Sequence, residues 1–323
     1  MRVLVTGAAG FAGSYLVELL LARGCEVCGV VFPGGPVENL SAVHRDPRLT
    51  LVEVDLCDPG GVAATIETVR PDQVYHLAAV SSVRQSMRDP RLAFRVNTLG
   101  TLYVLEGVRR AGLATRILFV SSAEVYGESA DRNRALRETD PLRPVSPYAV
   151  SKAAAEGIAR RYAREYGLGV VRVRPFPHTG PRHAPLFAYS DWARQLVEIE
   201  SGRQVPRLQV GNLGICRDIS DVRDVVDGYA LVLVHGQAGS VYNVCTGRGL
   251  ILRDVLDQLI RLAGVRVTVE TGTDRLRPQD ISSLVGSPES LQSQTGWEAT
   301  IPLAQTLEDL LTYWRRRAAS PRS

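Results

Sequence analysis

Residues 3–13 read VLVTGAAGFAG, a short apolar run followed by glycines at positions 7, 10 and 13. Because glycine has no Cβ, Gly7, Gly10 and Gly13 permit a tight turn and the close approach of a pyrophosphate. The amphipathic stretch from about residue 12 to residue 22 would then begin a helix whose free N–H groups and positive dipole end face that anion. This pattern predicts the phosphate-binding turn of a dinucleotide-binding fold, in preference to a strand–helix turn with a structural purpose alone.

The rest of the first half alternates strand and helix patterns. We expect strands at residues 2–6, 26–32, 51–55, 73–77, 116–121 and 170–173, and helices at about 12–22, 92–111 and 147–166. Strands that alternate with helices form parallel sheets joined by right-handed crossovers. The predicted fold class is therefore α/β, with a doubly wound parallel sheet of the Rossmann type.

After residue 174 the pattern changes, and four prolines at positions 175, 177, 181 and 185 crowd one segment. Further helices are expected at residues 186–201, 222–235, 252–264 and 302–317, and short strands at 207–210, 241–244 and 265–269. We expect residues 222–244 to return to the first sheet. The predicted domains are therefore a Rossmann domain of residues 1–174 plus about 219–245, and a smaller, discontinuous α/β substrate lobe of about 175–218 plus 246–323.

Composition argues against several classes of protein. With 323 residues, 45% of them hydrophobic and 22% charged, the chain is typical of a folded protein of about two domains. The net charge is only +4, and the basic runs at residues 315–317 and 132–137 carry no interleaved aromatic residues, so we expect no nucleic-acid partner. We expect neither a membrane span nor a signal peptide, because no apolar run has the required length.

Cysteine usage indicates the compartment. Five cysteines are scattered at positions 25, 28, 57, 216 and 245, an odd number that argues against a disulfide framework. Cys25 and Cys28 form a C-x-x-C pair, but inside an expected strand rather than at a helix start, and a structural zinc needs four ligands. We therefore expect buried thiols, no metal site and a cytoplasmic location.

One basic residue stands apart from the others. Of the 38 Lys and Arg residues, 37 are Arg and one is Lys, Lys152. Lys152 follows Tyr148 by four residues, so on a helix the ammonium and the phenol lie on one face. A neighbouring cation favours the phenolate, and the tyrosine can exchange a proton with a substrate oxygen. Because Lys is compact whereas Arg is a broad planar fork, a chain this rich in Arg keeps Lys where the compact geometry is needed.

Ser121 and Ser122 end the strand expected at residues 116–121. The carboxyl ends of parallel strands face the ligand crevice, so a serine there can hydrogen-bond a reacting oxygen. One of the two serines is expected to cap the next turn instead, and we assign the chemical role to Ser122.

The adenosine side of the cofactor site has fewer signals. No acidic residue follows the second strand until Glu38, which slightly favours NADP over NAD. Asp55 and Leu56 follow the third strand, where the carboxylate either approaches the adenine or caps a turn. The sequence leaves both of these alternatives open.

Several motifs together resemble the extended short-chain dehydrogenases/reductases that modify sugar nucleotides. These motifs are TGAAGFAG (6–13), HLAAVSS (76–82), VSSAEVYG (120–127), SPYAVSK (146–152) and RPF (174–176). More narrowly, RPFPHTGP (174–181), residues 210–226, VYNVCTG (241–247), RLRPQD (275–280) and TGW (295–297) resemble GDP-4-keto-6-deoxymannose reductases and the related GDP-mannose 4,6-dehydratases.

The resemblance implies NAD(P)H-dependent reduction of GDP-4-keto-6-deoxy-D-mannose to GDP-D-rhamnose. Tyr148 would protonate the C4 oxygen, Lys152 would lower the tyrosine pKa and hold the nicotinamide ribose, and Ser122 would orient the keto oxygen. The implied cofactor residues are Gly7, Gly10, Phe11, Ala12, Gly13, Asp55, Leu56, Ala78, Tyr148 and Lys152. The implied substrate residues are Ser82, Glu124, Asn212, Arg217 and Arg277.

The sequence departs from the family pattern after the sixth expected strand. The family often has Asn where Pro177 stands, and residues of the Gly-Gln type where Arg182 and His183 stand. His178 can fill part of the polar role that Pro177 lacks. These departures affect the identity of the hexose more than the class of reaction.

Three alternatives to the reductase remain. Glu124 stands where dehydratases of this superfamily place a base, although Ala123 replaces their preceding polar residue, so a GDP-mannose 4,6-dehydratase is possible. A nucleotide-sugar 4-epimerase would keep the same Ser/Tyr/Lys set, and a dinucleotide-sensing regulator would keep only the fold. The resemblance also implies a homodimer, with the helices at residues 92–111 and 151–166 as the expected contact.

Overall fold

The larger part of the structure is built around a seven-stranded parallel sheet. The computed structural model describes residues 1–129, 134–276 and 280–319. In the order β11-β6-β5-β4-β1-β2-β3, the strands are β11 (Val241–Val244), β6 (Gly169–Pro175), β5 (Arg116–Val120), β4 (Gln73–His76), β1 (Arg2–Thr6), β2 (Glu26–Val31) and β3 (Leu49–Glu53). Every neighbouring pair is parallel. The predicted doubly wound sheet is confirmed, and residues 241–244 do return to it.

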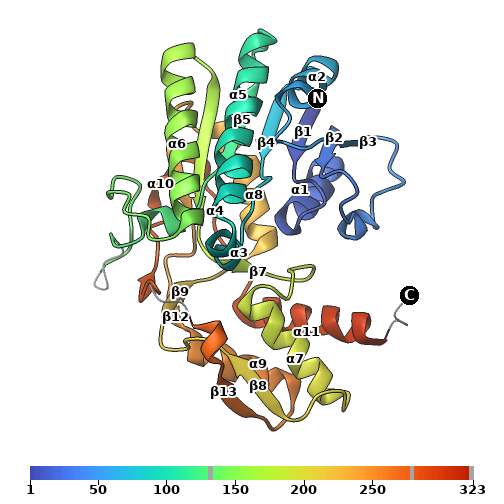
Figure 1. Cartoon of the computed structure of the whole chain (residues 1–323), viewed down its shortest axis with the longest axis vertical. Helices are drawn as coiled ribbons and strands as arrows, with labels where there is room; N and C mark the ends of the chain where they lie inside the picture. The colour runs from blue at the N-terminus through green and yellow to red at the C-terminus, as the bar shows by residue number, and fades with distance from the viewer. Residues whose placement is uncertain (130–133, 277–279, 320–323) are drawn as a thin grey trace.

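Helices cover both faces of the sheet (Figure 1). One face carries α1 (Phe11–Ala22) and α8 (Val222–His235), and the other carries α2 (Pro59–Val69), α5 (Gly100–Arg110) and α6 (Pro147–Tyr166). A further helix, α10 (Glu289–Thr295), packs against α8. Because both faces are covered, the strands are apolar along most of their length instead of alternating with polar residues.

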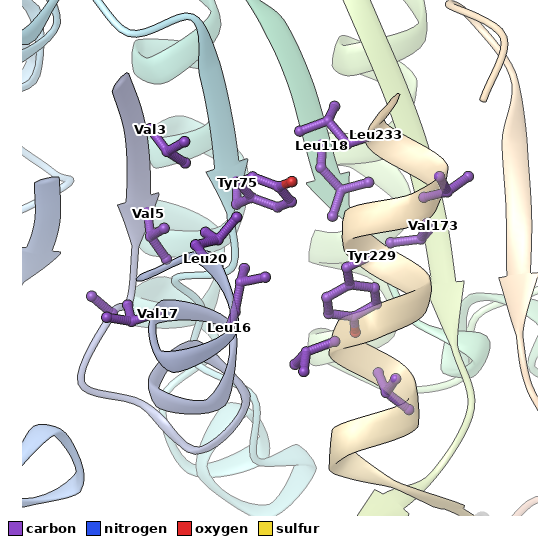
Figure 2. Close-up of a cluster of buried hydrophobic side chains, with 14 of the residues drawn as sticks. Val3, Val5, Leu16, Val17, Leu20, Tyr75, Leu118, Val173, Tyr229 and Leu233 are labelled. Atoms are coloured by element: carbon purple, nitrogen blue, oxygen red, sulfur yellow. The ribbon is translucent and has the colours of Figure 1, made fainter. Parts of the chain in front are cut away.

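The core on the α1 and α8 face shows how this packing is achieved. Figure 2 shows Val3 and Val5 of β1 pointing toward Leu16 of α1, while Tyr229 of α8 lies against the sheet near Val173. These side chains are buried, with exposed fractions between 0% and 1%. Burying one side chain of this size contributes about 1.5–3 kcal/mol, so this shared core stabilises the packing of both helices on the sheet.

The two cysteines of the C-x-x-C pattern lie on opposite faces of the sheet. Cys25 belongs to the core between the sheet and α1, whereas Cys28 belongs to the core under α2 and α5. Burial raises the pKa of both thiols, that of Cys28 to about 11. The expectation of buried thiols is confirmed for this pair.

A smaller lobe lies beyond the carboxyl edge of the sheet (Figure 1). Its helices α7 (Ala188–Glu200), α9 (Leu252–Ala263) and α11 (Leu303–Ala319) enclose a second apolar core. Its strands form three short sheets: β8 (Arg207–Val210) with β13 (Thr268–Thr271), β9 (Cys216–Asp218) between β12 (Gly249–Ile251) and β14 (Ser283–Leu284), and β7 (His178–Thr179) with β10 (Ser220–Asp221). β7 and β10 come directly after β6 and directly before α8, so they join the lobe to the sheet.

One predicted helix is interrupted. Instead of a continuous helix at residues 92–111, the chain forms α4 (Pro90–Ala93), a π-helical segment η2 (Phe94–Leu99) and α5. Inside the wide turn, the buried Asn97 amide accepts from the Val80 N–H at 2.8 Å and donates to the Val80 carbonyl at 3.2 Å. It also donates to Ser151 Oγ at 2.9 Å. The π turn serves these polar contacts, which hydrophobic periodicity does not report.

Several elements were absent from the prediction. They are the helices α2, α3 (Val83–Arg88) and α10, the strands β7, β9, β10, β12 and β14 of the lobe, and the 3-10 turns η1 (Glu38–Leu40), η3 (Ala123–Tyr126) and η4 (Thr273–Arg275). The start of α2 had a signal, because Asp58 caps the helix and Pro59 occupies its first position. Among the elements that were predicted, several ends are shifted, those of β3 and β13 by two or three residues. Within the described part of the chain, no helix combines the length and apolarity that a membrane span requires.

Candidate active site

The glycine turn between β1 and α1 leaves no room for side chains. Gly7 has φ +70°, and a Cβ on it would lie 2.9 Å from Ala78 Cα. A Cβ on Gly13 would lie 2.0 Å from the Gly7 carbonyl oxygen. Helix α1 begins after Gly10, which supplies no side-chain cap, and the first turn holds no acidic residue. The N–H groups of Phe11, Ala12 and Gly13 therefore have no intrahelical acceptor, and this helix start fits the pyrophosphate of a dinucleotide.

Asp55, Leu56 and Ala78, which were expected to line the cofactor site, make different contacts. Asp55 Oδ1 accepts the Cys57 N–H at 2.9 Å, so its carboxylate does cap its own turn. Leu56 is buried against Gly100 in the core of the sheet. Ala78 follows β4, donates its N–H to Thr6 Oγ1 at 3.2 Å and lines the glycine turn. Ala78 and the glycines are thus brought together as predicted.

The Tyr148, Lys152 and Ser122 side chains meet at the carboxyl edge of the sheet. Ser146 caps α6 by accepting the Ala149 N–H at 3.1 Å, and Pro147 occupies the first helical position. This start places Tyr148 and Lys152 on the buried face of α6, with exposed fractions of 9% and 3%. Ser122 follows β5, is 7% exposed and interacts by hydrogen bonding with the Tyr148 side chain.

Burial controls the charge of both groups on α6. It raises the pKa of Tyr148 to about 12, the negative charge of Glu124 acts in the same direction, and the hydrogen bond with Ser122 opposes it. The lowered tyrosine pKa expected from the Tyr148–Lys152 spacing is therefore not found, because desolvation outweighs the effect of neighbouring charge. Burial also lowers the pKa of Lys152 to about 7, while the nearby Glu156 carboxylate raises it. Tyr148 is thus a protonated acid at neutral pH.

Four buried residues support this trio and were not predicted. Ser86 Oγ accepts the Tyr148 backbone N–H at 3.0 Å, and Asn97 holds the Ser151 hydroxyl. His76 bonds Thr6 and Thr101 through its two ring nitrogens, and burial lowers its pKa to about 3. Glu156 accepts from Ser121 and Arg174. Only His76 had a signal, as the first residue of the HLAAVSS motif; the others depend on tertiary contacts.

The geometry described above is that of a known family. The sequence pattern of the family described as GDP-mannose 4,6 dehydratase matches residues 4–310. The chain belongs to that family. It is therefore an NAD(P)-dependent enzyme of the extended short-chain dehydrogenase/reductase type that modifies a nucleotide sugar.

Relatives of this extended short-chain dehydrogenase/reductase differ in reaction and cofactor. GDP-6-deoxy-D-mannose reductase of Pseudomonas aeruginosa is 34% identical over 316 residues, which cover 98% of each protein. The solved structure of RMD from Pseudomonas aeruginosa complexed with NADPH has a TM-score of 0.83 at 32% identity, covering 98% of this chain and 99% of that one. The Thermus thermophilus UDP-glucose 4-epimerase complex with NAD has a TM-score of 0.87 at 35% identity, covering 99% and 100%.

The five residues expected to bind the substrate do not gather at one place in the sequence or in one element. Ser82 is buried and caps α3, accepting the Gln85 N–H at 3.2 Å. Glu124 lies beside the Ser122–Tyr148–Lys152 trio, since its backbone N–H donates to Ser122 Oγ at 3.2 Å. Asn212 is exposed in the lobe, and its side chain accepts the Gly214 N–H at 3.0 Å. Of the four that the structure describes, Ser82 caps α3 and Glu124 belongs to η3, and both of these elements contact α6, the helix of Tyr148 and Lys152.

Two arginines were expected on phosphates. Arg217 is 5% exposed and donates to the Cys216 carbonyl at 2.8 Å and the Ile281 carbonyl at 2.7 Å. Its guanidinium also lies 3.5 Å from Asp280 Oδ1, so Arg217 holds the lobe together through contacts already made. Arg277 lies outside the described residues.

Aromatic rings connect the glycine turn to the segment 178–187, where the sequence departs from the family. Phe11 stacks on His183 with ring centroids 4.2 Å apart and on His178 at 5.9 Å. His183 stacks in turn on Phe187 at 4.5 Å. Burial lowers the pKa of His183 to about 3, so its ring is neutral in the stack. The first side chain of α1 is therefore held by the segment that follows β6.

The same segment contacts two further turns of α1. Arg182 has a left-handed backbone, with φ +71°, and its side chain pairs with Glu18 at 2.7 Å. Its guanidinium lies 4.5 Å over the Tyr15 ring, and the Tyr15 hydroxyl donates to the Pro181 carbonyl at 3.1 Å. The residues at positions 182 and 183, where the sequence departs from the family, thus join α1 to the segment that follows β7. Pro177 contributes only its carbonyl, which accepts the Ser220 N–H.

Proposed function

We propose that the protein reduces the 4-keto group of GDP-4-keto-6-deoxy-D-mannose to give GDP-D-rhamnose. The observation that carries the proposal is the buried Ser122–Tyr148–Lys152 set at the carboxyl edge of the sheet, with Tyr148 in its protonated form. The 34% identity to GDP-6-deoxy-D-mannose reductase over almost the whole of both chains supports this choice of sugar and nucleotide. The sequence departs from the family pattern at Pro177 and at residues 182–183, and these differences bear mainly on which hexose the protein binds.

The residues divide the work of the reduction. Bound NADPH supplies the hydride. Ser122 donates a hydrogen bond to the C4 oxygen and holds it near the Tyr148 phenol, which gives that oxygen its proton. Lys152 donates hydrogen bonds to the nicotinamide ribose, and its ammonium offsets the negative charge that develops when the phenol loses a proton.

Substrate binding in this proposal combines residues from both parts of the chain. Ser82 and Glu124 contact the hexose, Asn212 contacts the diphosphate side, and Arg277 supplies a cation to the phosphates. Arg217, whose guanidinium is held by the Ile281 carbonyl, contributes to the same phosphate site. The Rossmann part is taken as residues 1–174 plus about 219–245, with the substrate lobe formed by the remaining residues.

We infer that NADPH is preferred over NADH. β2 ends at Val31 and is followed by Phe32, which is 66% exposed, so no carboxylate stands where the ribose hydroxyls of NAD are usually held. The 2′-phosphate of NADP would meet no negative charge at this strand end. Parallel titrations with NADPH and NADH test the preference, and tighter binding of NADH contradicts it.

A dehydratase is the second candidate, favoured by one observation. The carboxylate of Glu124 is close enough to Tyr148 to raise the tyrosine pKa, so a base stands beside the acid. A dehydratase would remove the C5 proton and protonate the departing C6 hydroxyl. Ala123 supplies no second polar group, and for this reason we favour the reductase.

We also propose that the enzyme is a cytoplasmic homodimer. Apolar side chains stand exposed along α3, η2 and α6: Met87, Phe94, Leu99 and Val150. Pairing of this face with a second copy would remove them from water, where such side chains rarely gather. Light scattering after gel filtration tests the pairing, and a monomer at micromolar concentration contradicts it.

The reaction is tested by offering the purified protein a panel of substrates. GDP-4-keto-6-deoxy-D-mannose with NADPH or NADH is expected to oxidise the cofactor and yield GDP-D-rhamnose. Parallel incubations use GDP-mannose, which a dehydratase consumes, and UDP-sugars, which a 4-epimerase interconverts. Loss of GDP-mannose without cofactor oxidation contradicts the reductase and supports the dehydratase.

A further inference from the structure

Glu156 is a carboxylate inside the protein, one turn after Lys152 on α6. Its exposed fraction is 2% and that of Lys152 is 3%. The spacing of four residues places both side chains on the buried face of the helix. Acidic residues are rarely buried to this extent without a purpose, and the reaction described above assigns none to Glu156.

Three side chains hold this carboxylate. Arg174 on β6 donates from Nη2 to Oε1 at 2.6 Å and from Nε to Oε2 at 3.1 Å. The Ser121 hydroxyl donates to Oε2 at 2.7 Å, and Arg172 Nη1 lies 3.5 Å from Oε1. These charge-assisted bonds hold the pKa of Glu156 below its usual value in spite of burial, so the group is an anion.

The contacts of Glu156 span the elements that carry the catalytic trio. Ser121 is the residue before Ser122, so its bond to Glu156 ties the end of β5 to the helix of Tyr148 and Lys152. Arg174 extends the network, because its Nη1 donates to the Tyr126 hydroxyl at 2.9 Å. The Tyr126 hydroxyl in turn donates to an Asn243 side chain on β11 at 2.7 Å. One carboxylate thus connects α6, β5, β6 and β11.

The charges around Lys152 come from four elements. On α6 itself, Tyr148 is neutral and Glu156 is negative; on β4, the buried His76 is neutral. On β5, the Phe119 ring lies 4.8 Å from Lys152 Nζ. The cations of β6, Arg172 and Arg174, reach toward Glu156. Among these groups, Glu156 supplies the negative charge that favours the ammonium form of Lys152.

We propose that Glu156 is a positioning residue for the reaction: it holds the Ser122 segment against α6 and favours the ammonium form of the lone lysine. The proposal rests on the catalytic role proposed for Lys152. Removal of the carboxylate would leave Arg172, Arg174 and Lys152 together without an anion, and the lysine is the one of these three cations that gives up its proton most readily.

Because the chain has a single lysine, its titration can be followed directly. Protein labelled with ¹³C-lysine gives one ε-methylene signal in an NMR spectrum, that of Lys152. In the cofactor-free protein, Glu156→Gln is expected to move the midpoint of this signal to lower pH by about one pH unit or more. The control is Glu165→Gln on the same helix, where an exposed carboxylate pairs with Arg161 at 2.8 Å; its midpoint should equal that of the wild type.

Two further variants separate charge from tethering. Glu156→Asp keeps the charge and is expected to restore most of the midpoint. Ser121→Ala keeps the carboxylate and its arginine partner but removes the bond to β5, so the midpoint should stay while kcat falls about tenfold with KM little changed.

An unchanged Lys152 midpoint in folded Glu156→Gln overturns the proposal. If that variant does not fold, Ser121→Ala is the test, and a wild-type kcat in Ser121→Ala overturns the proposal. The NMR titration uses no substrate, so it does not depend on whether the protein reduces a GDP-linked sugar.

Discussion

Replacement of Lys152 by methionine is expected to stabilise the fold while it abolishes the reaction. Burial lowers the pKa of Lys152 from 10.5 to about 7. In the unfolded chain the same side chain is exposed and keeps its ordinary pKa. The folded state therefore carries a charge, or gives up a proton, at a cost that the unfolded state does not have. Methionine fills the same space without a charge, being unbranched and adaptable.

The size and pH dependence of the effect follow from these two values. The difference of 10.5 minus about 7 is about 3.5 pH units, and each pH unit corresponds to about 1.4 kcal/mol. Most of this penalty is present at about pH 7.5, where Lys152→Met should raise the free energy of unfolding by about 4 kcal/mol. Between pH 7 and pH 10.5 the unfolded chain binds more protons than the folded one, so the wild type gains stability as pH rises and the advantage of the variant disappears.

Urea unfolding followed by circular dichroism measures this difference at neutral pH and near pH 10. The matched control is Tyr148→Phe, which removes one polar atom from the same pocket. Since Tyr148 is neutral over most of this range, the stability change in the control should depend little on pH. The reasoning would be refuted if Lys152→Met were no more stable than the wild type at neutral pH and if the difference in unfolding free energy did not change with pH.

Three other variants test separate parts of the site. Lys152→Arg should lower kcat by about 100-fold although the charge is kept, because the planar guanidinium does not fit where a compact ammonium stands; steady-state kinetics with near-normal turnover would contradict this. Gly13→Ala places a Cβ 2.0 Å from the Gly7 carbonyl and should weaken NADPH binding at least tenfold by fluorescence titration, whereas Gly157→Ala, with open space around it, should bind NADPH normally. A double-mutant cycle of Arg182→Ala and Glu18→Gln, read by thermal unfolding, should give a coupling of about 0.5–1 kcal/mol, and strict additivity would show that the pair does not join the lobe to α1.

Local rules were sufficient for most of the sheet. β1, β8, α8 and β11 begin and end where the pattern of apolar residues predicts. For the first three, a glycine, a proline or a capping side chain marks at least one end. The interrupted helix around Asn97 could not be predicted in this way. Its wide turn is set by contacts with Val80 and Ser151, which lie 17 and 54 residues away along the chain.

In the candidate site, too, features set by local spacing could be predicted and features set by tertiary contacts could not. The turn at Gly7 could be predicted from the glycine spacing, and the shared helix face of Tyr148 and Lys152 from their spacing of four residues. Glu156 was missed, since nothing in the sequence distinguishes a buried glutamate on α6 from an exposed one such as Glu165. The pKa of Tyr148 was predicted in the wrong direction, because spacing reports a neighbouring charge but not the depth of burial.

The fate of the hydride tests the central claim most directly. NADPH carrying deuterium at the transferable position is incubated with the protein and GDP-4-keto-6-deoxy-D-mannose, and the hexose is analysed by NMR. The account predicts one deuterium at C4 of GDP-D-rhamnose for each NADPH oxidised, and loss of that product in Tyr148→Phe. An unlabelled hexose, with the deuterium still on the cofactor, would contradict it.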